Sequence, residues 1–448
     1  MHIRDATEIP TEIPLKPSSY NFYFPIEANG AVLFNSRTGA AMAADEATSR
    51  AIVLLLQDPQ RAASTGSNFC RTKEVLVREG FLVADDLDEL GEIRRRRAAR
   101  QAEIGGLSLT VAVTLACNFR CVYCYQSHPV ENMDFATADA LLRFAIERLA
   151  PATSLDVTWF GGEPLLNVDI IEYLSRRFRA ICDEKGCSYK ATMITNGYRL
   201  TAQMARRLAG ADVKDYQISI DGERDYHDRQ RPLAGGQGTF DVLMKNLSAV
   251  ANEVSSITVR INLLRANIDS AARLVRRLKA IQRETPTLSV SFGHVDKSSD
   301  HCGADQSTLL SHREFAECKE MLLGGDGESK IGNGALPAPF DTICCADRLN
   351  SYVIAPNGEV FKCWNSLGRR GESIGRIDGP IAEHASPWLN FQADEDVECR
   401  TCKFLPVCQG GCPDVQIRSG RSQKECTELK YTLRQRLTEW ALERAVAR

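Results

Sequence analysis

The sequence predicts an α/β protein with a parallel sheet covered by helices, together with a separate cysteine-rich region. Strand and helix patterns alternate six times between about residues 107 and 295, and such alternation is typical of β/α units. Most of the cysteines cluster in two segments, 117–124 and 344–426. The units form either a partial barrel or a doubly wound sheet, and in both folds chemistry lies at the carboxyl ends of the strands.

Length and composition limit the classes of protein that fit. The chain has 448 residues, of which 44% are hydrophobic and 25% charged, so two or three globular domains are expected. Its formal charge is −3, which leaves no general basic field for nucleic acid or an anionic membrane. We find neither a secretory N-terminus nor an apolar run near ~18 residues, so we expect a cytoplasmic protein without membrane contact.

The number of cysteines is the first chemical signal. The chain holds 16, and in a reducing compartment metal ligation or catalysis explains so many better than disulfides do. Their clustering supports ligation. Cys70, Cys182 and Cys187 fit no ligand spacing, and we interpret them as small buried apolar side chains.

The N-terminal region, residues 1–95, is predicted to be a winged-helix-like module. Residues 1 to about 18 are expected to be irregular, and residues 20–34 alternate around Asn29-Gly30 as a hairpin does. Helical patterns follow at 47–56 and 73–78, and a short apolar strand at 81–83. Residues 88–104 carry four consecutive arginines and are interpreted as a solvated linker helix, with a patch for an acidic partner as the alternative.

The following domain, residues 105–296, carries the repeated units. Strands are predicted at 108–115, 156–160, 189–195, 213–220, 257–264 and 288–292. A bridge at 297–339 contains one helix at 312–323, and a domain at 340–448, organised by metal, closes with an amphipathic helix at 426–447. Arg260 and Asn262 are polar positions on an otherwise apolar strand, and they either face a lumen or serve a buried structural role.

Cys117, Cys121 and Cys124 form a CxxxCxxC triplet directly after the first predicted strand of this domain. Three thiolates at this spacing can hold three corners of a cubane iron–sulfur cluster and leave its fourth iron open. An open iron favours catalysis over simple electron transfer. A zinc site is less favoured because structural zinc takes four closed ligands.

The segment 117–124, Cys-Asn-Phe-Arg-Cys-Val-Tyr-Cys, resembles the signature of the radical S-adenosylmethionine (SAM) superfamily, including the aromatic Tyr123 before the third cysteine. The resemblance implies a partial (β/α)6 TIM-like barrel. It also implies a [4Fe-4S] cluster whose open iron binds SAM, and reductive cleavage of SAM to a 5′-deoxyadenosyl radical.

Further SAM-side residues follow from the same resemblance. Gly161, Gly162, Glu163 and Pro164 end the second strand as the GGEP motif of the family, which meets the SAM amino group through backbone carbonyls and Glu163. Asn196 follows the third strand, Ser219 and Asp221 follow the fourth, and Arg231 resembles the arginine that meets the SAM carboxylate.

The C-terminal cysteines resemble the SPASM extension of radical SAM enzymes, which carries two auxiliary clusters. The pattern runs Cys345, twelve residues, Gly358, four residues, Cys363, then Cys399-x2-Cys402-x5-Cys408-x3-Cys412 and Cys426. By resemblance, one [4Fe-4S] cluster takes Cys399, Cys402, Cys408 and Cys426, and the other takes Cys345, Cys363 and Cys412, giving three clusters in the chain. The fourth ligand of the cluster held by Cys345, Cys363 and Cys412 is Cys344, Cys302, Cys318 or none. A zinc ribbon formed by Cys399/Cys402 with Cys408/Cys412 is the structural alternative.

The resemblance implies an oxidoreductase that matures a ribosomally made precursor peptide through an intramolecular thioether or carbon–carbon crosslink. The N-terminal module would bind the leader sequence as an added strand, and a flavodoxin- or ferredoxin-type protein would donate electrons. Alternatives are epimerisation, a non-enzymatic electron-transfer role, and formylglycine formation in sulfatases. The last is disfavoured because Trp364 follows Cys363, where the family has a catalytic Asp. The sequence assigns no catalytic acid or base.

Overall fold

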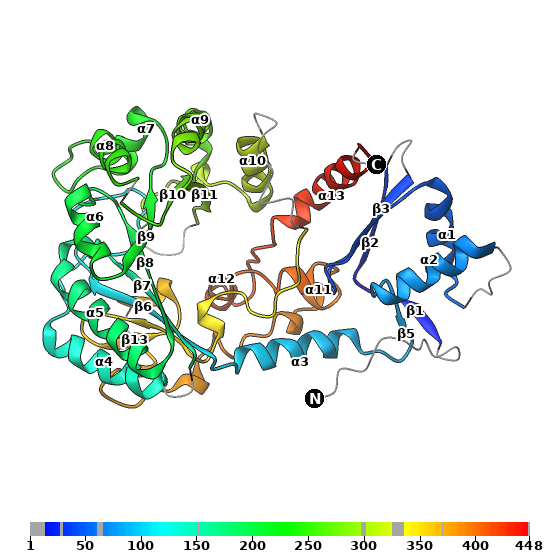
Figure 1. The fold of residues 1–448 in the computed structure, drawn as a ribbon, viewed down its shortest axis with the longest axis horizontal. Helices are drawn as coiled ribbons and strands as arrows, with labels where there is room; N and C mark the ends of the chain where they lie inside the picture. The colour runs from blue at the N-terminus through cyan, green and yellow to red at the C-terminus, as the bar shows by residue number, and fades with distance from the viewer. Residues whose placement is uncertain are drawn as a thin grey trace.

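The computed structural model describes residues 14–446 apart from 27–29, 61–65, 150–151, 252, 297–301, 325–335 and 370. Figure 1 shows an α/β barrel at one end of the molecule, the N-terminal module at the other, and the cysteine-rich C-terminal region between them. Within the described residues, no helix combines the length and apolar character needed to span a membrane.

One nine-stranded sheet organises the barrel, in the order β11-β10-β9-β8-β7-β6-β12-β13-β14. Its first six members along the chain are parallel and lie in chain order without reversal, which identifies a partial barrel rather than a doubly wound sheet. All six predicted strands are confirmed, with ends shifted by at most two residues. They are β6(Gly106–Thr114), β7(Ser154–Gly161), β8(Ser188–Thr195), β9(Val213–Ser219), β10(Ser256–Leu263) and β11(Leu288–His294).

Helices cover the outside of these strands (Figure 1). In α4(Phe135–Leu149) the apolar residues at 138, 141, 142, 145 and 149 are all buried, because their spacing of three and four places them on one face. That face packs into the main core beside the strands. The other helices of the barrel are α5(Val168–Lys185), α6(Ala202–Ala209), α7(Arg224–Gln230), α8(Phe240–Val250) and α9(Ile268–Glu284).

The sheet continues past the boundary that the sequence predicts near residue 340. Strand β12(Ser351–Ile354) pairs in parallel with β6, and β13(Glu359–Phe361) and β14(Gly375–Arg376) extend the sheet antiparallel. Cys345 precedes β12 and Cys363 follows β13. The pairing therefore anchors these cysteines beside β6, the strand that leads into the CxxxCxxC loop.

In the N-terminal module, β2(Asn21–Ile26), β3(Gly30–Asn35) and β4(Ala41–Ala44) form an antiparallel sheet, followed by α1(Glu46–Gln57) and α2(Gly66–Arg78). The hairpin is confirmed, although residues 27–29 of its turn lie outside the described residues. The expected irregular arm is wrong at β1(Leu15–Pro17), which pairs with β5(Leu82–Ala84). Residues 1–13 are not described.

The sheet of this module is buried on both faces. Leu33 packs against the helices α1 and α2, whereas Val32 and Phe34 face the C-terminal helix α13(Leu429–Val446). Alternate residues of a strand point to opposite faces, so β3 joins two cores. The predicted closing helix thus docks on the N-terminal module.

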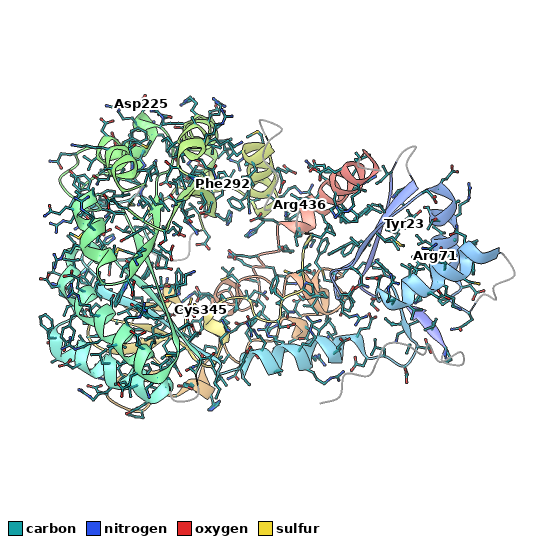
Figure 2. The ribbon with its side chains drawn as sticks, in the orientation of Figure 1. Tyr23, Arg71, Asp225, Phe292, Cys345 and Arg436 are labelled. Carbon is teal, nitrogen blue, oxygen red and sulfur yellow. The ribbon has the colours of Figure 1, made fainter. Side chains whose placement is uncertain are left out.

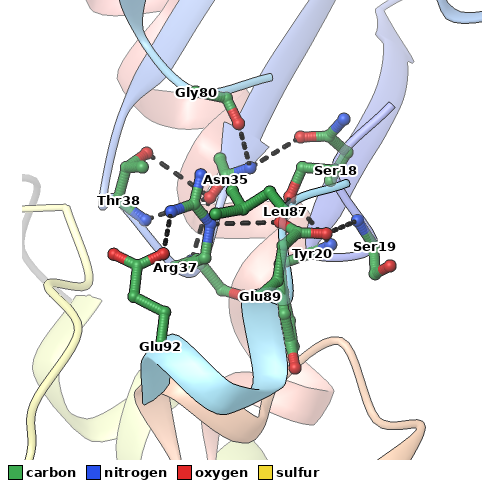
Figure 3. Close-up of polar contacts among 12 residues, drawn as sticks. Ser18, Ser19, Tyr20, Asn35, Arg37, Thr38, Gly80, Leu87, Glu89 and Glu92 are labelled. Carbon is green, nitrogen blue, oxygen red and sulfur yellow. Dashed lines mark hydrogen bonds and ion pairs between the residues drawn. The ribbon is translucent and has the colours of Figure 1, made fainter. Parts of the chain in front are cut away.

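The linker helix α3(Glu89–Gln101) is less solvated than we expect from its charge, because Glu89, Ile93 and Arg97 are buried. Figure 3 shows Arg37 of the N-terminal module between two carboxylates of α3, with its Nε 3.1 Å from Glu89 and its Nη1 2.7 Å from Glu92. Further along, Arg97 donates to the carbonyl of Phe391 at 3.1 Å. The helix therefore ties the N-terminal module to the C-terminal region.

Candidate functional site

A cavity of about 390 Å³ opens at the carboxyl ends of the barrel strands. Side chains and backbone from the loops after β6, β7 and β8 and from the ends of β9, β10 and β11 line it. Nine residues that the sequence predicts as ligands or SAM contacts are among them: Cys117, Cys121, Tyr123, Cys124, Gly161, Gly162, Asn196, Ser219 and Arg231. The fold thus gathers at one place residues that are up to 114 positions apart.

The cysteine loop is fixed by backbone contacts. The Arg120 N–H donates to the Pro232 carbonyl and the Val122 N–H to the Gln230 carbonyl, both at 2.9 Å. These bonds place the loop against the segment that carries Arg231. Asn196 Nδ2 lies 3.9 Å and the Phe119 N–H 3.4 Å from the Cys117 sulfur.

The environment of the triplet suits metal-bound thiolates. Burial raises the pKa of Cys117 to about 12 and that of Cys121 to about 11, and the guanidinium of Arg231 opposes the rise at Cys121. A buried thiolate needs a compensating cation, which a bound metal supplies.

A hydrogen-bonded network centred on the Tyr123 hydroxyl supports the cavity wall. That hydroxyl donates to the Asp221 carboxylate and accepts from Arg231 Nη1 at 2.5 Å and Asn262 Nδ2 at 3.0 Å. Arg231 Nε is buried without a hydrogen-bond partner. Because an unpaired buried donor is costly, this nitrogen fits an anionic group in the cavity such as the SAM carboxylate.

The two glycines of the GGEP segment form a close backbone approach. Gly161 has φ +120°, and a Cβ there would lie 2.1 Å from the Thr114 carbonyl oxygen; at Gly162 a Cβ would lie 2.3 Å from that of Ala116. Any side chain would push the GGEP segment away from the start of the cysteine loop.

Three predicted SAM contacts, Glu163, Pro164 and Asp221, are buried behind the cavity wall and do not line it. The carboxylate of Glu163 is fully buried and accepts from Leu165 N at 3.0 Å, Thr195 Oγ1 at 2.7 Å and Asn196 N at 2.8 Å. Protein donors thus bond to both oxygens, and Oε2 accepts only one of these bonds, so the direct contact of Glu163 with the SAM amino group stays a prediction. Within the structure Glu163 positions the Thr195-Asn196 turn, and Asp221 holds Tyr123.

The C-terminal cysteines interact electrostatically in two groups. Cys363 interacts with Cys345 and Cys412, whereas Cys408 interacts with Cys402 and Cys426, and Cys399 with Cys402 and Cys408. These are the two groups that the sequence resemblance assigns to separate clusters. Figure 2 labels Cys345 near the side of the barrel that faces the N-terminal module.

The sequence offers three candidates for a fourth ligand to the group of Cys345, Cys363 and Cys412. Of these, only Cys344 lies against the group. Hydrogen bonding from the Cys344 thiol lowers the pKa of Cys345 to about 7. Cys318 packs on α10(His312–Gly324) against the barrel core. Cys302 is buried and interacts with Cys124 of the barrel triplet, and the next residue, Gly303, bonds to Val122 at 2.9 Å.

The sequence reasoning missed several cavity residues, among them Gln217, His294 and Asp296. A signal for them exists, because polar residues occur two apart at the ends of three successive strands: Gln217 and Ser219, Arg260 and Asn262, and His294 and Asp296. Alternate residues of a strand share a face. Arg260 and Asn262 do line the cavity, and Arg260 Nε donates to Asn262 Oδ1 at 3.0 Å.

Comparison with known proteins agrees with this geometry. Residues 111–278 match the family model described as Radical SAM superfamily. The chain is 27% identical over 329 residues to a mycofactocin maturase, MftC, of Mycolicibacterium smegmatis, which covers 70% of this chain and 80% of that relative.

Solved structures share the fold. One is anSMEcpe with bound AdoMet and the Cp18Cys peptide, with a TM-score of 0.58 at 17% identity, covering 76% of this chain and 98% of that one. Another is SuiB of Streptococcus suis bound to the precursor peptide SuiA, with a TM-score of 0.53 at 15% identity, covering 90% of this chain and 97% of that one.

Proposed function

Because residues 111–278 form a radical SAM domain, we propose that this protein is a peptide maturase that forms an intramolecular crosslink, thioether or carbon–carbon, in a ribosomally made precursor peptide. The relatives support a peptide substrate, since MftC is named a maturase and SuiB is solved with a precursor peptide. The observation that carries the proposal is the cavity that gathers the CxxxCxxC sulfurs, the GGEP glycines and Arg231 around one space.

In the proposed reaction, Cys117, Cys121 and Cys124 hold the catalytic cluster, and Arg231 Nε binds the SAM carboxylate. The bound cluster and SAM supply the 5′-deoxyadenosyl radical. The chain itself orients the reactants: Tyr123 and Asp221 fix the Arg231 guanidinium, and Glu163 fixes the turn of Asn196. Binding of SAM and the peptide in this cavity would exclude water, which limits side reactions of a radical.

A crosslink removes two hydrogen atoms from the peptide, so one electron must leave the site after the first hydrogen abstraction. We assign its acceptance to auxiliary clusters held by Cys345, Cys363 and Cys412 and by Cys399, Cys402, Cys408 and Cys426. Tyr125 supports a short path for this electron from the catalytic cluster to the auxiliary cluster, because it interacts with both Cys124 and Cys363. An external flavodoxin- or ferredoxin-type donor would reduce the catalytic cluster.

The leader sequence would bind at the N-terminal module. Strand β2 is an edge of the three-stranded sheet, and a groove of about 460 Å³ lies between it and α1, lined by Tyr23, Ile26, Val53 and Leu54. Tyr23 is labelled in Figure 2 on this sheet. An exposed strand edge beside an apolar groove is the usual site for adding a peptide strand.

The test is anaerobic incubation of the reconstituted protein with SAM, a reductant and the peptide encoded by the adjoining short reading frame. We expect 5′-deoxyadenosine, a peptide lighter by two hydrogen atoms, and about twelve irons per chain. Cys121→Ala should abolish the nucleoside. Absence of 5′-deoxyadenosine from the intact protein would refute the enzyme and favour an electron-transfer role, and about four irons would refute the auxiliary clusters.

Epimerisation is the second candidate, and Cys302 favours it. In this reaction a buried thiol that interacts with Cys124 would return a hydrogen atom to the carbon radical from the opposite face, and one electron from the external donor with a proton from water would restore the thiol. The product would then keep its mass in ordinary water and gain one deuterium in D₂O. Cys302→Ala would abolish that labelling, whereas it would leave a crosslinking reaction intact.

A further inference from the structure

Two histidines and a glutamate from three separate segments meet at the rim of the barrel cavity. His294 ends β11, His312 begins α10, and Glu425 precedes Cys426. One ligand atom from each lies within 4.8 Å of the others. The two imidazole rings are 4.6 Å apart between centroids. None of the three belongs to the CxxxCxxC triplet or to the C-terminal cysteine groups.

The ring of His294 is already oriented as a metal ligand. Its Nε2 lies 2.7 Å from the Leu310 carbonyl oxygen. A carbonyl only accepts, so Nε2 carries a proton, and Nδ1 is the nitrogen left to bind a metal. Metal-bound histidines commonly use the second ring nitrogen in this way to fix their tautomer and orientation.

Within the part of the chain that the structure describes, Glu425 also lacks a cationic partner. Glu425 hydrogen-bonds through its side chain to Asp296, so a second carboxyl group lies beside the three-residue cluster. Among the described residues, neither Lys nor Arg forms an ion pair with Glu425, while the nearby Glu428 is paired with Lys319 at 2.8 Å. In the described structure, two carboxyl groups therefore share this site with two imidazoles, and Glu425 forms no ion pair with Lys or Arg.

We propose that His294, His312 and Glu425 bind a divalent transition metal of the zinc type, with Asp296 as the fourth ligand. Two imidazoles and carboxylate oxygens are the donor set that zinc takes at bond lengths of ~2.0–2.2 Å. Closing around the ion requires the ligand atoms to approach to within about 3.3 Å of one another. The metal fixes the end of β11 to the segment before Cys426 and so stabilises one rim of the cavity.

The experiment measures zinc in the anaerobically reconstituted holoprotein after incubation with zinc sulfate and desalting. We expect one zinc per chain. X-ray absorption at the zinc edge should show nitrogen and oxygen neighbours at ~2.0 Å with imidazole scattering and without sulfur at ~2.3 Å. Zinc bound through sulfur would mean that it occupies cysteine sites, and this outcome or the absence of retained zinc would overturn the proposal.

Single substitutions test which side chains bind the zinc. His312→Ala and Glu425→Gln should each lower retained zinc at least tenfold, whereas His384→Ala, an exposed histidine of the C-terminal region, should retain it. Iron content serves as the control for folding and cluster assembly. Unchanged zinc in both ligand variants would refute the assignment. The spectrum of the unsubstituted protein decides the question even where a variant fails to assemble, and zinc content is independent of SAM cleavage.

Discussion

Arg231 donates a hydrogen bond to the Tyr123 hydroxyl at 2.5 Å, although 108 residues separate them. The bond joins the cysteine loop after β6 to the segment after α7. The same hydroxyl donates to Asp221 and accepts from Asn262. One oxygen atom thus connects the loops after β6 and β9 with strand β10. The network therefore holds in place the guanidinium of Arg231, which lines the cavity.

Tyr123→Phe should weaken SAM binding and destabilise this wall. The substitution leaves a buried Asp221 carboxylate short of one donor, at a cost of about 1–3 kcal/mol, and it releases Arg231. We expect the Kd for SAM to rise about tenfold, which corresponds to 1.4 kcal/mol, measured by equilibrium binding to the reconstituted protein. Tyr226→Phe is the matched control, since that hydroxyl is buried without a partner. Equal effects of both substitutions would contradict the role of the network.

Gly162→Ala should impair assembly at the cysteine triplet. Its Cβ would lie 2.3 Å from the Ala116 carbonyl oxygen, a backbone atom that can move only with the loop carrying Cys117. We expect a loss of about one cluster's iron, some four atoms, and at least a tenfold drop in 5′-deoxyadenosine. The control is Gly324→Ala, where a Cβ meets nothing within 4 Å. Normal iron in the Gly162 variant would show that the loop tolerates the shift.

Arg97→Met should destabilise the junction between the N-terminal module and the C-terminal region. The guanidinium lies 3.5 Å from Asp347 and bonds to Phe391, and both charged side chains are buried. Removing one partner leaves an uncompensated buried charge, at a cost of about 3–5 kcal/mol. Calorimetry of the holoprotein should show a lower Tm for Arg97→Met and partial recovery in Arg97→Met/Asp347→Asn. Arg100→Met, at an exposed pair with Glu103, should change stability by less than about 0.5 kcal/mol.

The barrel strands and the cysteine spacings were predictable because both signals are local. Each strand is an apolar run ended by turn residues, and the triplet spans only residues 117–124. The β12 pairing with β6 was not predictable, because a strand of four residues gives no periodic pattern and its partner lies more than 200 positions earlier.

Burial explains the other differences between the sequence predictions and the structure. Nothing in the GGEP letters shows that Glu163 turns away from the cavity to accept three protein hydrogen bonds. The charge of α3 suggested a solvated helix, yet Arg97 is buried by contacts with residues about 250 to 312 positions away. Long-range packing of this kind leaves no trace in a single local window.

His227 should make stability fall on acidification. Its Nδ1 accepts from the Asp221 N–H at 3.2 Å, and its Nε2 lies 3.1 Å from Thr239 Oγ1, which itself donates to the Arg231 carbonyl. The ring is therefore neutral, and burial, aided by Arg231, lowers its pKa to about 3. In the unfolded chain the pKa is about 6.5.

Between these two values the unfolded chain takes up a proton that the folded chain refuses. The stabilisation is complete above about pH 6.5 and is lost as pH falls toward 3, by up to about 1.4 kcal/mol per unit. His227→Asn keeps an acceptor for the Asp221 N–H and cannot titrate. Anaerobic urea unfolding should therefore give a stability difference between wild type and His227→Asn that shrinks from about pH 7.5 to about pH 5.5. Parallel pH profiles of the two proteins would contradict this prediction, because they would mean that His227 has the same pKa in the folded and the unfolded chain.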